Sequence, residues 1–149
     1  MEWTYFLPCL WAFLACAGFC VMFNIRTGVV HCCAGGALGW LVYLLIGLTG
    51  GANLLCYFLA AMTISFYSEL MARIRKCPVT GYLLISFFPL VPGAGIYYTM
   101  EYAIQGDTAN FLESGLHTLG IAACLAAGVL VATSLVRMVL TFRRHRGNA

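Results

Sequence analysis

The chain has 149 residues, of which 62% are hydrophobic and only 9% are charged. Soluble domains carry roughly 25% charged residues. This composition, with a mean hydropathy of +0.92, therefore excludes a soluble domain and predicts an all-α membrane protein. The net charge of +3 does not favour nucleic-acid binding, because the basic residues are few and flank apolar segments, as membrane anchors do.

Five apolar runs follow one another, each near the ~20 residues that a helix needs to cross a bilayer. The predicted spans are 5–23, 29–48, 54–72, 79–104 and 114–140. The first run is too long for a signal peptide and no Lys or Arg precedes it, so we interpret it as a retained helix. No polar stretch is long enough to fold separately. Residues 1–149 are therefore expected to form a single polytopic membrane domain.

The charges predict both the orientation and the number of spans. With five spans, all basic residues lie on one side of the membrane: Arg26, Arg73, Arg75, Lys76, Arg137, Arg143, Arg144 and Arg146. The other side has Glu2, Asp107, Glu113 and Glu101, with no Lys or Arg. The positive-inside rule then places the N-terminus outside and the C-terminus in the cytoplasm. Four spans would put basic loops on both sides, so the charge pattern favours five independently of hydropathy.

Small residues in the apolar runs predict close helix packing. Gly35 and Gly39 recur at a spacing of four, as do Gly120, Cys124 and Gly128, and such residues let membrane helices approach closely. The eight cysteines form no C-x-x-C pair and most lie inside apolar runs. They are therefore interpreted as packing residues rather than metal ligands or redox groups.

The fourth run is interrupted at 89–95. Pro89 and Pro92 remove backbone donors and clash with the preceding turn, whereas Gly93 and Gly95 add conformational freedom. A helix cannot run straight through this segment. In a bilayer, broken backbone is tolerated only where protein buries it or where it lines a water-filled cavity. The sequence therefore predicts two half-helices on either side of the break.

Such a break is a candidate substrate site. The first N–H groups of the second half-helix lie at the positive end of its dipole and can hold a substrate carboxylate. The carbonyl groups at the end of the first half-helix can receive an ammonium group or a coupling cation. Tyr97 and Tyr98 follow the break, and either can face a cavity. The alternative is a plain proline kink whose freed groups are satisfied by neighbouring helices, with both tyrosines in packing roles.

Three charged residues are candidates for gating or coupling. Glu69 precedes Arg73 by four residues, which predicts an ion pair on one helix face. The pair is interpreted either as an interfacial anchor or as a cytoplasmic gate with a proton-sensitive carboxylate. Glu101 is a functional candidate because ionisable residues in spans are costly, although an interfacial position is the alternative. His117 can titrate near neutrality, but its place near a helix end favours an interfacial role.

Several phrases together resemble a known family. They are Met22-Phe23-Asn24-Ile25, Gly35-Gly36-Ala37-Leu38-Gly39-Trp40, Glu69 with Ala72-Arg73 and Pro78, Phe88-Pro89-Leu90-Val91-Pro92-Gly93, Tyr97-Tyr98-Thr99-Met100 and Gly106-Asp107. In this order, over almost the whole chain, they resemble the short membrane subunit of the threonine/serine exporter family. That subunit corresponds to the C-terminal membrane domain of long exporters and is also similar to the small subunit of a two-component succinate exporter. Arg26 stands where relatives often have proline, which leaves any role of Asn24 open.

The resemblance implies export of threonine, serine or a small dicarboxylate across the bacterial inner membrane. It also implies a longer membrane subunit as partner. No cofactor or metal is expected, and coupling to a proton or cation gradient is possible. Five helices without internal duplication are few for a complete alternating-access pathway, so a partner or a homo-oligomer is expected on physical grounds too. A non-transporting scaffold subunit is the alternative. An enzyme is disfavoured, because no H-E-x-x-H motif, nucleophile elbow or paired membrane aspartates occur.

Overall fold

The computed structural model describes residues 7–25 and 28–146, and within them every regular element is a helix. The elements are α1 (Leu7–Met22), α2 (Val29–Leu48), α3 (Asn53–Arg75), α4 (Val79–Phe87), the short 3-10 helix η2 (Phe88–Leu90), α5 (Gly93–Gln105) and α6 (Thr108–Arg146). The predicted all-α class is confirmed. The bounds of α2 equal the predicted span, and α4 begins at the predicted residue, directly after Pro78.

Three of the described helices are long and apolar enough to cross a membrane: α2, α3 and residues Thr108–Thr141 of α6. The bent pair Val79–Leu90 and Gly93–Gln105 makes a fourth if it is counted as one span. α1 is apolar, but its 16 described residues are fewer than the ~20 that a straight crossing needs. The structure thus supports three or four spans, and the count of five stays a prediction.

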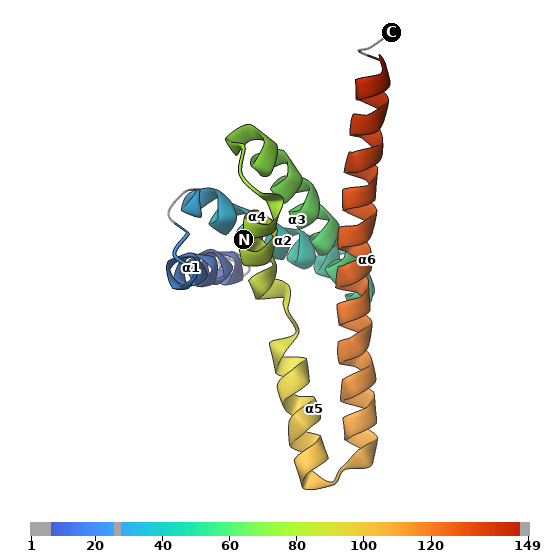
Figure 1. Ribbon diagram of the computed structural model, residues 1–149. Coiled ribbons are helices and arrows are strands. Elements are labelled where there is room, and N and C mark those ends of the chain that lie inside the picture. The colour runs from blue at the N-terminus through green and yellow to red at the C-terminus, as the bar shows by residue number, and fades with distance from the viewer. Residues whose placement is uncertain (1–6, 26–27, 147–149) are drawn as a thin grey trace.

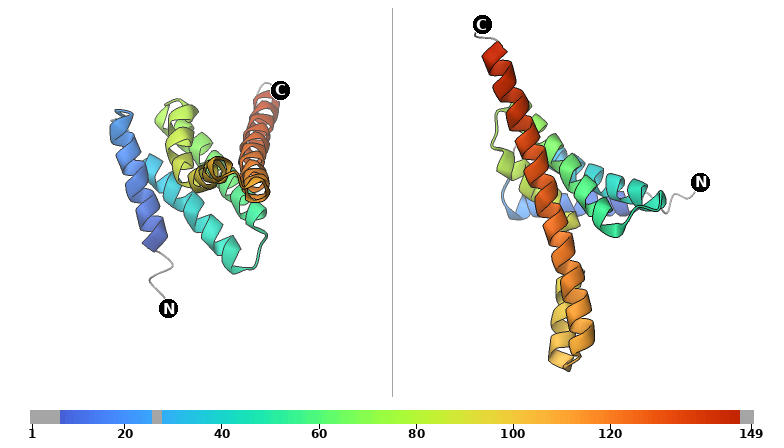
Figure 2. Two further views of the ribbon diagram at one scale, coloured as in Figure 1. Left: turned by 90° about the horizontal axis from the view of Figure 1, so that it is seen from below. Right: turned by 90° about the vertical axis from the view of Figure 1, so that its right-hand side faces the viewer.

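The long helix α6 connects two parts of the molecule. Its 39 residues extend over about 58 Å at ~1.5 Å per residue, nearly twice the ~30 Å thickness of a bilayer core. One half packs across α3, beside the group formed by α1 to α4 (Figures 1 and 2). The other half runs beside α5, and this α5–α6 hairpin (α5 with residues 108–120 of α6) extends away from α1–α4 (Figure 1).

Glycines bring the helices into close contact, as the sequence predicts. A Cβ atom at Gly39 of α2 would lie 2.6 Å from Cγ1 of Ile64 on α3. A Cβ atom at Gly128 of α6 would lie 2.7 Å from the backbone oxygen of Phe58 on α3. Both distances are far shorter than ordinary contact, so a Cβ atom at either glycine would force its neighbour to shift.

Five of the eight cysteines are buried, in agreement with the predicted packing role. All eight are free thiols, and four of them lie in the buried core between α1 and α2: Cys16, Cys20, Cys32 and Cys33. A second buried cluster joins α3, η2 and α6 through Ala60, Ala61, Ile64, Leu90, Ile121 and Leu125. The end of the first half-helix is therefore anchored between α3 and α6.

α6 begins at Thr108 rather than at the predicted residue 114, because Asp107 caps it. The backbone N–H of Asn110 donates to Oδ1 of Asp107 at 3.2 Å, and the Asn110 amide donates to Oδ2 at 2.6 Å. The Asn110 amide, together with the backbone donor, holds the pKa of Asp107 below its ordinary value. Gly106, with φ 74°, ends α5 just before the cap. Hydropathy marks the apolar part of a helix, whereas the cap sets its first residue.

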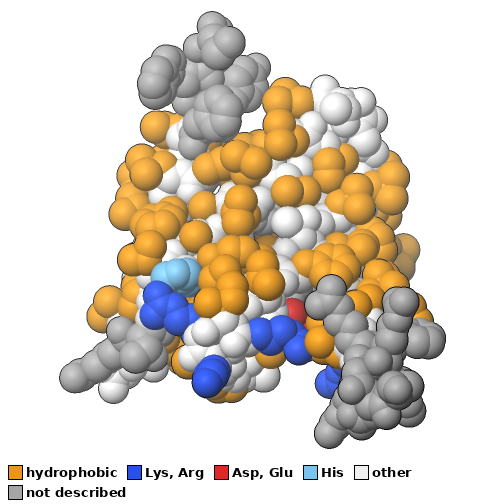
Figure 3. All heavy atoms as spheres, turned by 90° about the horizontal axis from the view of Figure 1, so that it is seen from above, with side chains coloured by type: hydrophobic (Ala, Val, Ile, Leu, Met, Phe, Trp, Pro, Cys, Tyr) orange, Lys and Arg blue, Asp and Glu red, His pale blue; other side chains and the backbone are white. Residues whose placement is uncertain are grey.

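The described Lys and Arg side chains, those of Arg73, Arg75, Lys76 and Arg137, gather along one edge of the face in Figure 3. A guanidinium nitrogen of Arg75 lies 3.2 Å from Nδ1 of His31. The predicted orientation also rests on charged side chains that the structure does not describe, namely those of Glu2, Arg26, Arg143, Arg144 and Arg146. The predicted orientation therefore stays a prediction.

Candidate functional site

The predicted break is present, and its backbone geometry is defined by Pro92. The two half-helices meet at an angle of 54°. Pro92 has φ −75° and ψ 58°, and the N–H of Gly93 donates to the carbonyl oxygen of Val91 at 2.7 Å. These values describe an inverse γ-turn. The chain thus changes direction within three residues, rather than bending gradually as a kinked helix does.

The upstream side of the break is held by neighbouring helices. The ring of Phe88 stacks on that of Phe19 in α1, with centroids 3.7 Å apart. Leu90 is only 1% exposed and belongs to the cluster between α3 and α6. A Cβ atom at Gly36 of α2 would lie 3.5 Å from Cγ of Pro89. These contacts from four helices fix the end of the first half-helix in place.

The downstream side is open. A Cβ atom at Gly93 would meet nothing within 4 Å. The N–H of Ile96 donates to the carbonyl of Pro92, whereas the N–H groups of Ala94 and Gly95 have no backbone acceptor among the described residues. These two donors, at the positive end of α5, are the free backbone groups that the sequence predicts.

Gly95 has a second role, in the contact between α5 and α6. A Cβ atom there would collide with the hydroxyl of Thr118. One turn further along α5, the hydroxyl of Thr99 donates to the carbonyl of Gly95 at 2.7 Å and lies 3.0 Å from the hydroxyl of Ser114. A seam of small and hydroxyl residues therefore joins the two arms of the hairpin directly beyond the break.

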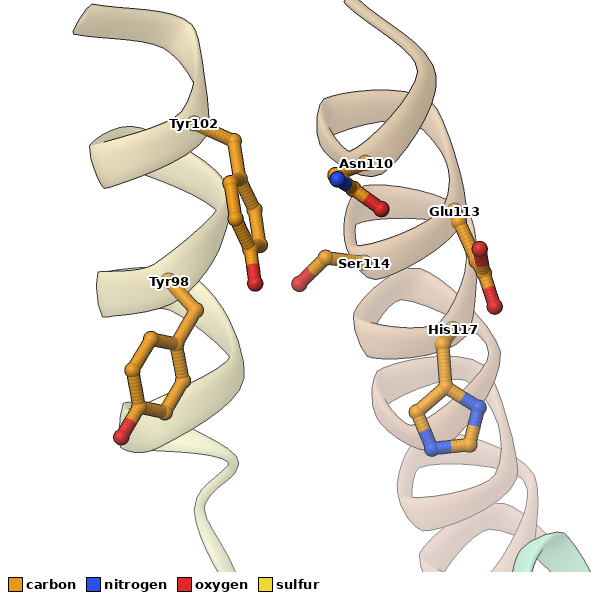
Figure 4. A pocket seen from close by; sticks show the side chains of 6 residues that line it. All are labelled: Tyr98, Tyr102, Asn110, Glu113, Ser114 and His117. Carbon is orange, nitrogen blue, oxygen red and sulfur yellow. The ribbon is translucent and has the colours of Figure 1, made fainter. Parts of the chain in front are cut away.

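A pocket of about 320 Å³ opens between α5 and α6 next to this seam (Figure 4). It is lined by Tyr98, Tyr102, Asn110, Glu113, Ser114 and His117. Figure 4 shows the hydroxyl groups of Tyr102 and Ser114 directed toward one another from facing helices. All six lining residues have polar side chains, in a chain that is 62% hydrophobic. We call it the hairpin pocket.

A hydrogen-bonded chain connects this pocket to α2 and α3. The hydroxyl of Tyr43 donates to Oδ1 of Asn53 at 3.1 Å, and Nδ2 of Asn53 lies 3.4 Å from Nε2 of His117. The ring of Tyr43 also packs against Tyr57, with centroids 4.8 Å apart. The chain of contacts thus links α2 and α3 to His117 of α6.

The remaining predicted site residues lie in different places. Tyr98 lines the hairpin pocket, whereas Tyr97 is 65% exposed and contacts Tyr98 edge-on at 5.5 Å. The predicted ion pair of Glu69 and Arg73 is present at 3.1 Å, about two turns before the end of α3. Glu101 accepts a hydrogen bond from Gln105 at 3.2 Å on α5. The structure therefore places Tyr98 in the hairpin pocket and leaves the ion pair on a separate helix.

Sequence reasoning missed most of the hairpin pocket. Tyr102, Asn110 and Ser114 received no role, and Glu113 was considered only for its charge. The signal that was available is the i, i+4 spacing of Glu113 and His117, which places both on one helix face. Among the described residues, no group of three or more His, Cys, Asp or Glu side chains is arranged to hold a metal ion.

The comparisons with known proteins identify one family. A family model described as Threonine/Serine exporter, ThrE, matches residues 8–135, which is well over half of the chain. Comparison with curated proteins and with solved structures gave no match.

Proposed function

The chain belongs to the threonine/serine exporter family, and on this premise we propose that it is one subunit of a bacterial secondary transporter in the inner membrane. Its substrate is threonine, serine or a small dicarboxylate, and it acts with a longer membrane subunit. The family is one of transporters rather than enzymes, and the apolar helices fit a multi-pass membrane protein.

The observation that carries the proposal is the break between α4 and α5. A bend of 54° joins two short helices in a chain in which α2, α3 and α6 are apolar and long. The free N–H groups of Ala94 and Gly95 suit a carboxylate, because they lie at the positive end of α5. Gly93 lacks a side chain that would cover this backbone, and its surroundings are open. Pro89 and Pro92 keep the two half-helices apart.

The other candidate residues are assigned around this site. Tyr97 and Tyr98 follow the break on the first turns of α5 and can contact a substrate that leaves it. Glu69 and Arg73, near the end of α3, are assigned to a cytoplasmic gate. Glu101 is assigned to coupling with a proton or cation gradient, since it is the carboxylate on α5 itself.

The proposed topology has five spans, with the N-terminus outside and the C-terminus in the cytoplasm. The basic edge in Figure 3 supports this orientation, because basic side chains favour the cytoplasmic surface. The exposed surface of α5, which has no buried residue, supports contact with lipid, with the longer subunit or with a second copy. A pathway completed by two chains fits the general design of such transporters.

Replacing Gly93 by leucine tests the site. The new side chain covers the free N–H groups, while its Cβ enters open space. We expect flux in proteoliposomes to fall at least about tenfold, as for the loss of a charge-assisted hydrogen bond, with the complex still assembled. The matched control is Gly81→Leu in α4, where a Cβ also meets nothing within 4 Å. Unchanged flux in Gly93→Leu would show that the break does not bind substrate, and would favour the scaffold alternative.

A further inference from the structure

Each proline of the break removes the N–H that an α-helix would donate to the carbonyl group four residues earlier. For Pro89 that carbonyl group belongs to Ile85. For Pro92 it belongs to Phe88. Both carbonyl groups accept from a residue three positions ahead instead. The N–H of Phe88 donates to Ile85, and the N–H of Val91 donates to Phe88 at 3.3 Å. The break is therefore built on replaced hydrogen bonds.

The carbonyl group of Ile85 has a second donor, which comes from another helix. The thiol of Cys16 on α1 donates to it, with Sγ and the carbonyl oxygen 3.4 Å apart. A carbonyl oxygen has two lone pairs, so it can accept from the thiol and from the N–H of Phe88 together. Cys16 and Ile85 are both 0% exposed, so bulk water does not reach this bond. Cys16 thus supplies a donor to the group that Pro89 leaves without its helical partner.

Other contacts hold α1 beside the end of the first half-helix. A Cβ atom at Gly36 of α2 would collide with Sγ of Cys16, on the side where Pro89 also approaches this glycine. The ring of Phe19, three residues beyond Cys16, stacks on that of Phe88, which is three residues beyond Ile85. Two side chains of α1 therefore contact two points of α4 and η2 at the same spacing.

A series of backbone hydrogen bonds leads from Ile85 to the proposed substrate site. The first two bonds join Ile85 to Phe88 and Phe88 to Val91. In the third, the N–H of Gly93 donates to the carbonyl of Val91 at 2.7 Å. The two free N–H groups that are proposed to bind the substrate carboxylate follow directly after Gly93. Hydrogen bonds in a chain strengthen one another, so the position of the Ile85 carbonyl group influences the position of these donors.

From this arrangement we infer that Cys16 is a positioning residue for the substrate site at the break. Its thiol holds the carbonyl group of Ile85, and the series of backbone bonds transmits that position to the start of α5. The inference rests on the proposed function. It also gives α1, whose described residues are too few for a straight crossing, a part in building the site.

The test compares Cys16→Ala with Cys16→Ser in the full-length chain, reconstituted with its longer subunit in proteoliposomes. Serine keeps a donor on the same carbon atom, whereas alanine removes it. Counterflow is measured with serine, threonine and succinate. We expect Cys16→Ala to raise the KM of the transported compound about twofold to fivefold, the range of a weak hydrogen bond. Cys16→Ser should bring the KM back toward that of the wild type.

The matched control is Cys20→Ala. Cys20 lies one turn further along α1, is also 0% exposed and packs in the same cluster. This change removes the same atoms from that cluster but leaves the hydrogen bond to Ile85 in place. We expect the KM of Cys20→Ala to equal that of the wild type, even if both alanine variants lose stability.

Infrared spectroscopy observes the hydrogen bond itself. The stretching band of an S–H group moves to lower frequency when the group donates a hydrogen bond. The difference spectrum of the wild type and Cys16→Ala should contain such a lowered band. Saturating substrate should shift this band, because the substrate binds at the other end of the series of backbone bonds. A thiol that only fills space would not respond, and Gly93→Leu should abolish the shift.

Three outcomes overturn the inference and leave the transport proposal standing, provided that Gly93→Leu still lowers flux. The first is a KM in Cys16→Ser as high as that in Cys16→Ala. The second is an equal rise in Cys20→Ala, since lost packing then explains both. The third is a Cys16 band at the frequency of a free thiol. Failure of the transport proposal has a different signature, namely no counterflow of any of the three compounds, which also removes the site that Cys16 is inferred to position.

Discussion

The crossing of α6 over α3 gives the sharpest prediction about stability. A Cβ atom at Gly128 would lie 2.7 Å from the backbone oxygen of Phe58 and 2.8 Å from Cβ of Ala61. Ordinary contact begins at 3.4 Å, so Gly128→Ala must move the helices apart by about 0.7 Å. A gap of this size costs packed atoms about a quarter to a half of their van der Waals attraction. Neither neighbour can rotate away, because one is backbone and the other is a Cβ atom.

The magnitude follows from two opposing effects. Overpacking costs about 1–3 kcal/mol, and replacing glycine by alanine inside a helix regains about 0.5–1 kcal/mol. From the middle of both ranges we expect Gly128→Ala to lower the free energy of unfolding by about 1 kcal/mol. The control is Gly18→Ala in α1, where a Cβ meets nothing within 4 Å and only the gain applies. Thermal unfolding in detergent measures the stability of both variants. The packing argument is refuted if Gly128→Ala is as stable as the wild type.

Three further predictions concern the hairpin and the ion pair. Gly95→Ala should weaken the contact between α5 and α6 and lower flux. Adding Thr118→Ala should restore the contact and the flux, because it removes the hydroxyl that the new Cβ atom meets. A double variant as impaired as Gly95→Ala alone would contradict this packing argument. The pKa of Asp107 is lower in the folded than in the unfolded chain. The stabilisation that Asp107 provides is therefore complete above its unfolded pKa and is lost as the pH falls through its folded pKa. Unfolding curves between neutral pH and pH ~3 should show this acid-dependent loss in the wild type but not in Asp107→Asn. Glu69→Gln should change stability by less than ~1 kcal/mol, as for helical pairs four residues apart, and should lower flux if the pair forms a gate. Unchanged flux would assign the pair a structural role.

Local chemistry explains which parts of the fold were predictable. The break followed from Pro89, Pro92 and the neighbouring glycines, because proline acts on its own backbone and on the preceding turn. The bounds of α2 followed from an apolar run with turn residues at both ends. The start of α6 did not, because residues 108–113 mix polar and apolar side chains and only the Asp107 cap shows that they are helical.

The hairpin pocket was not predictable, because it depends on how α5 and α6 align. Tyr102 and Ser114 are twelve residues apart in sequence, and nothing local fixes that they face each other. The link from Tyr43 through Asn53 to His117 depends on three helices. His117 appeared interfacial in the sequence for the same reason, since its partner is 64 residues away. Packing decides such contacts, and hydropathy does not record them.

Counterflow in proteoliposomes tests the central claim most directly. The chain is reconstituted with its longer subunit, the vesicles are loaded with unlabelled serine, threonine or succinate, and uptake of the labelled compound is followed. The account predicts transient accumulation of labelled serine or threonine, lost in Gly93→Leu and kept in Gly81→Leu. Absence of counterflow for all three compounds, with the complex assembled, would contradict it.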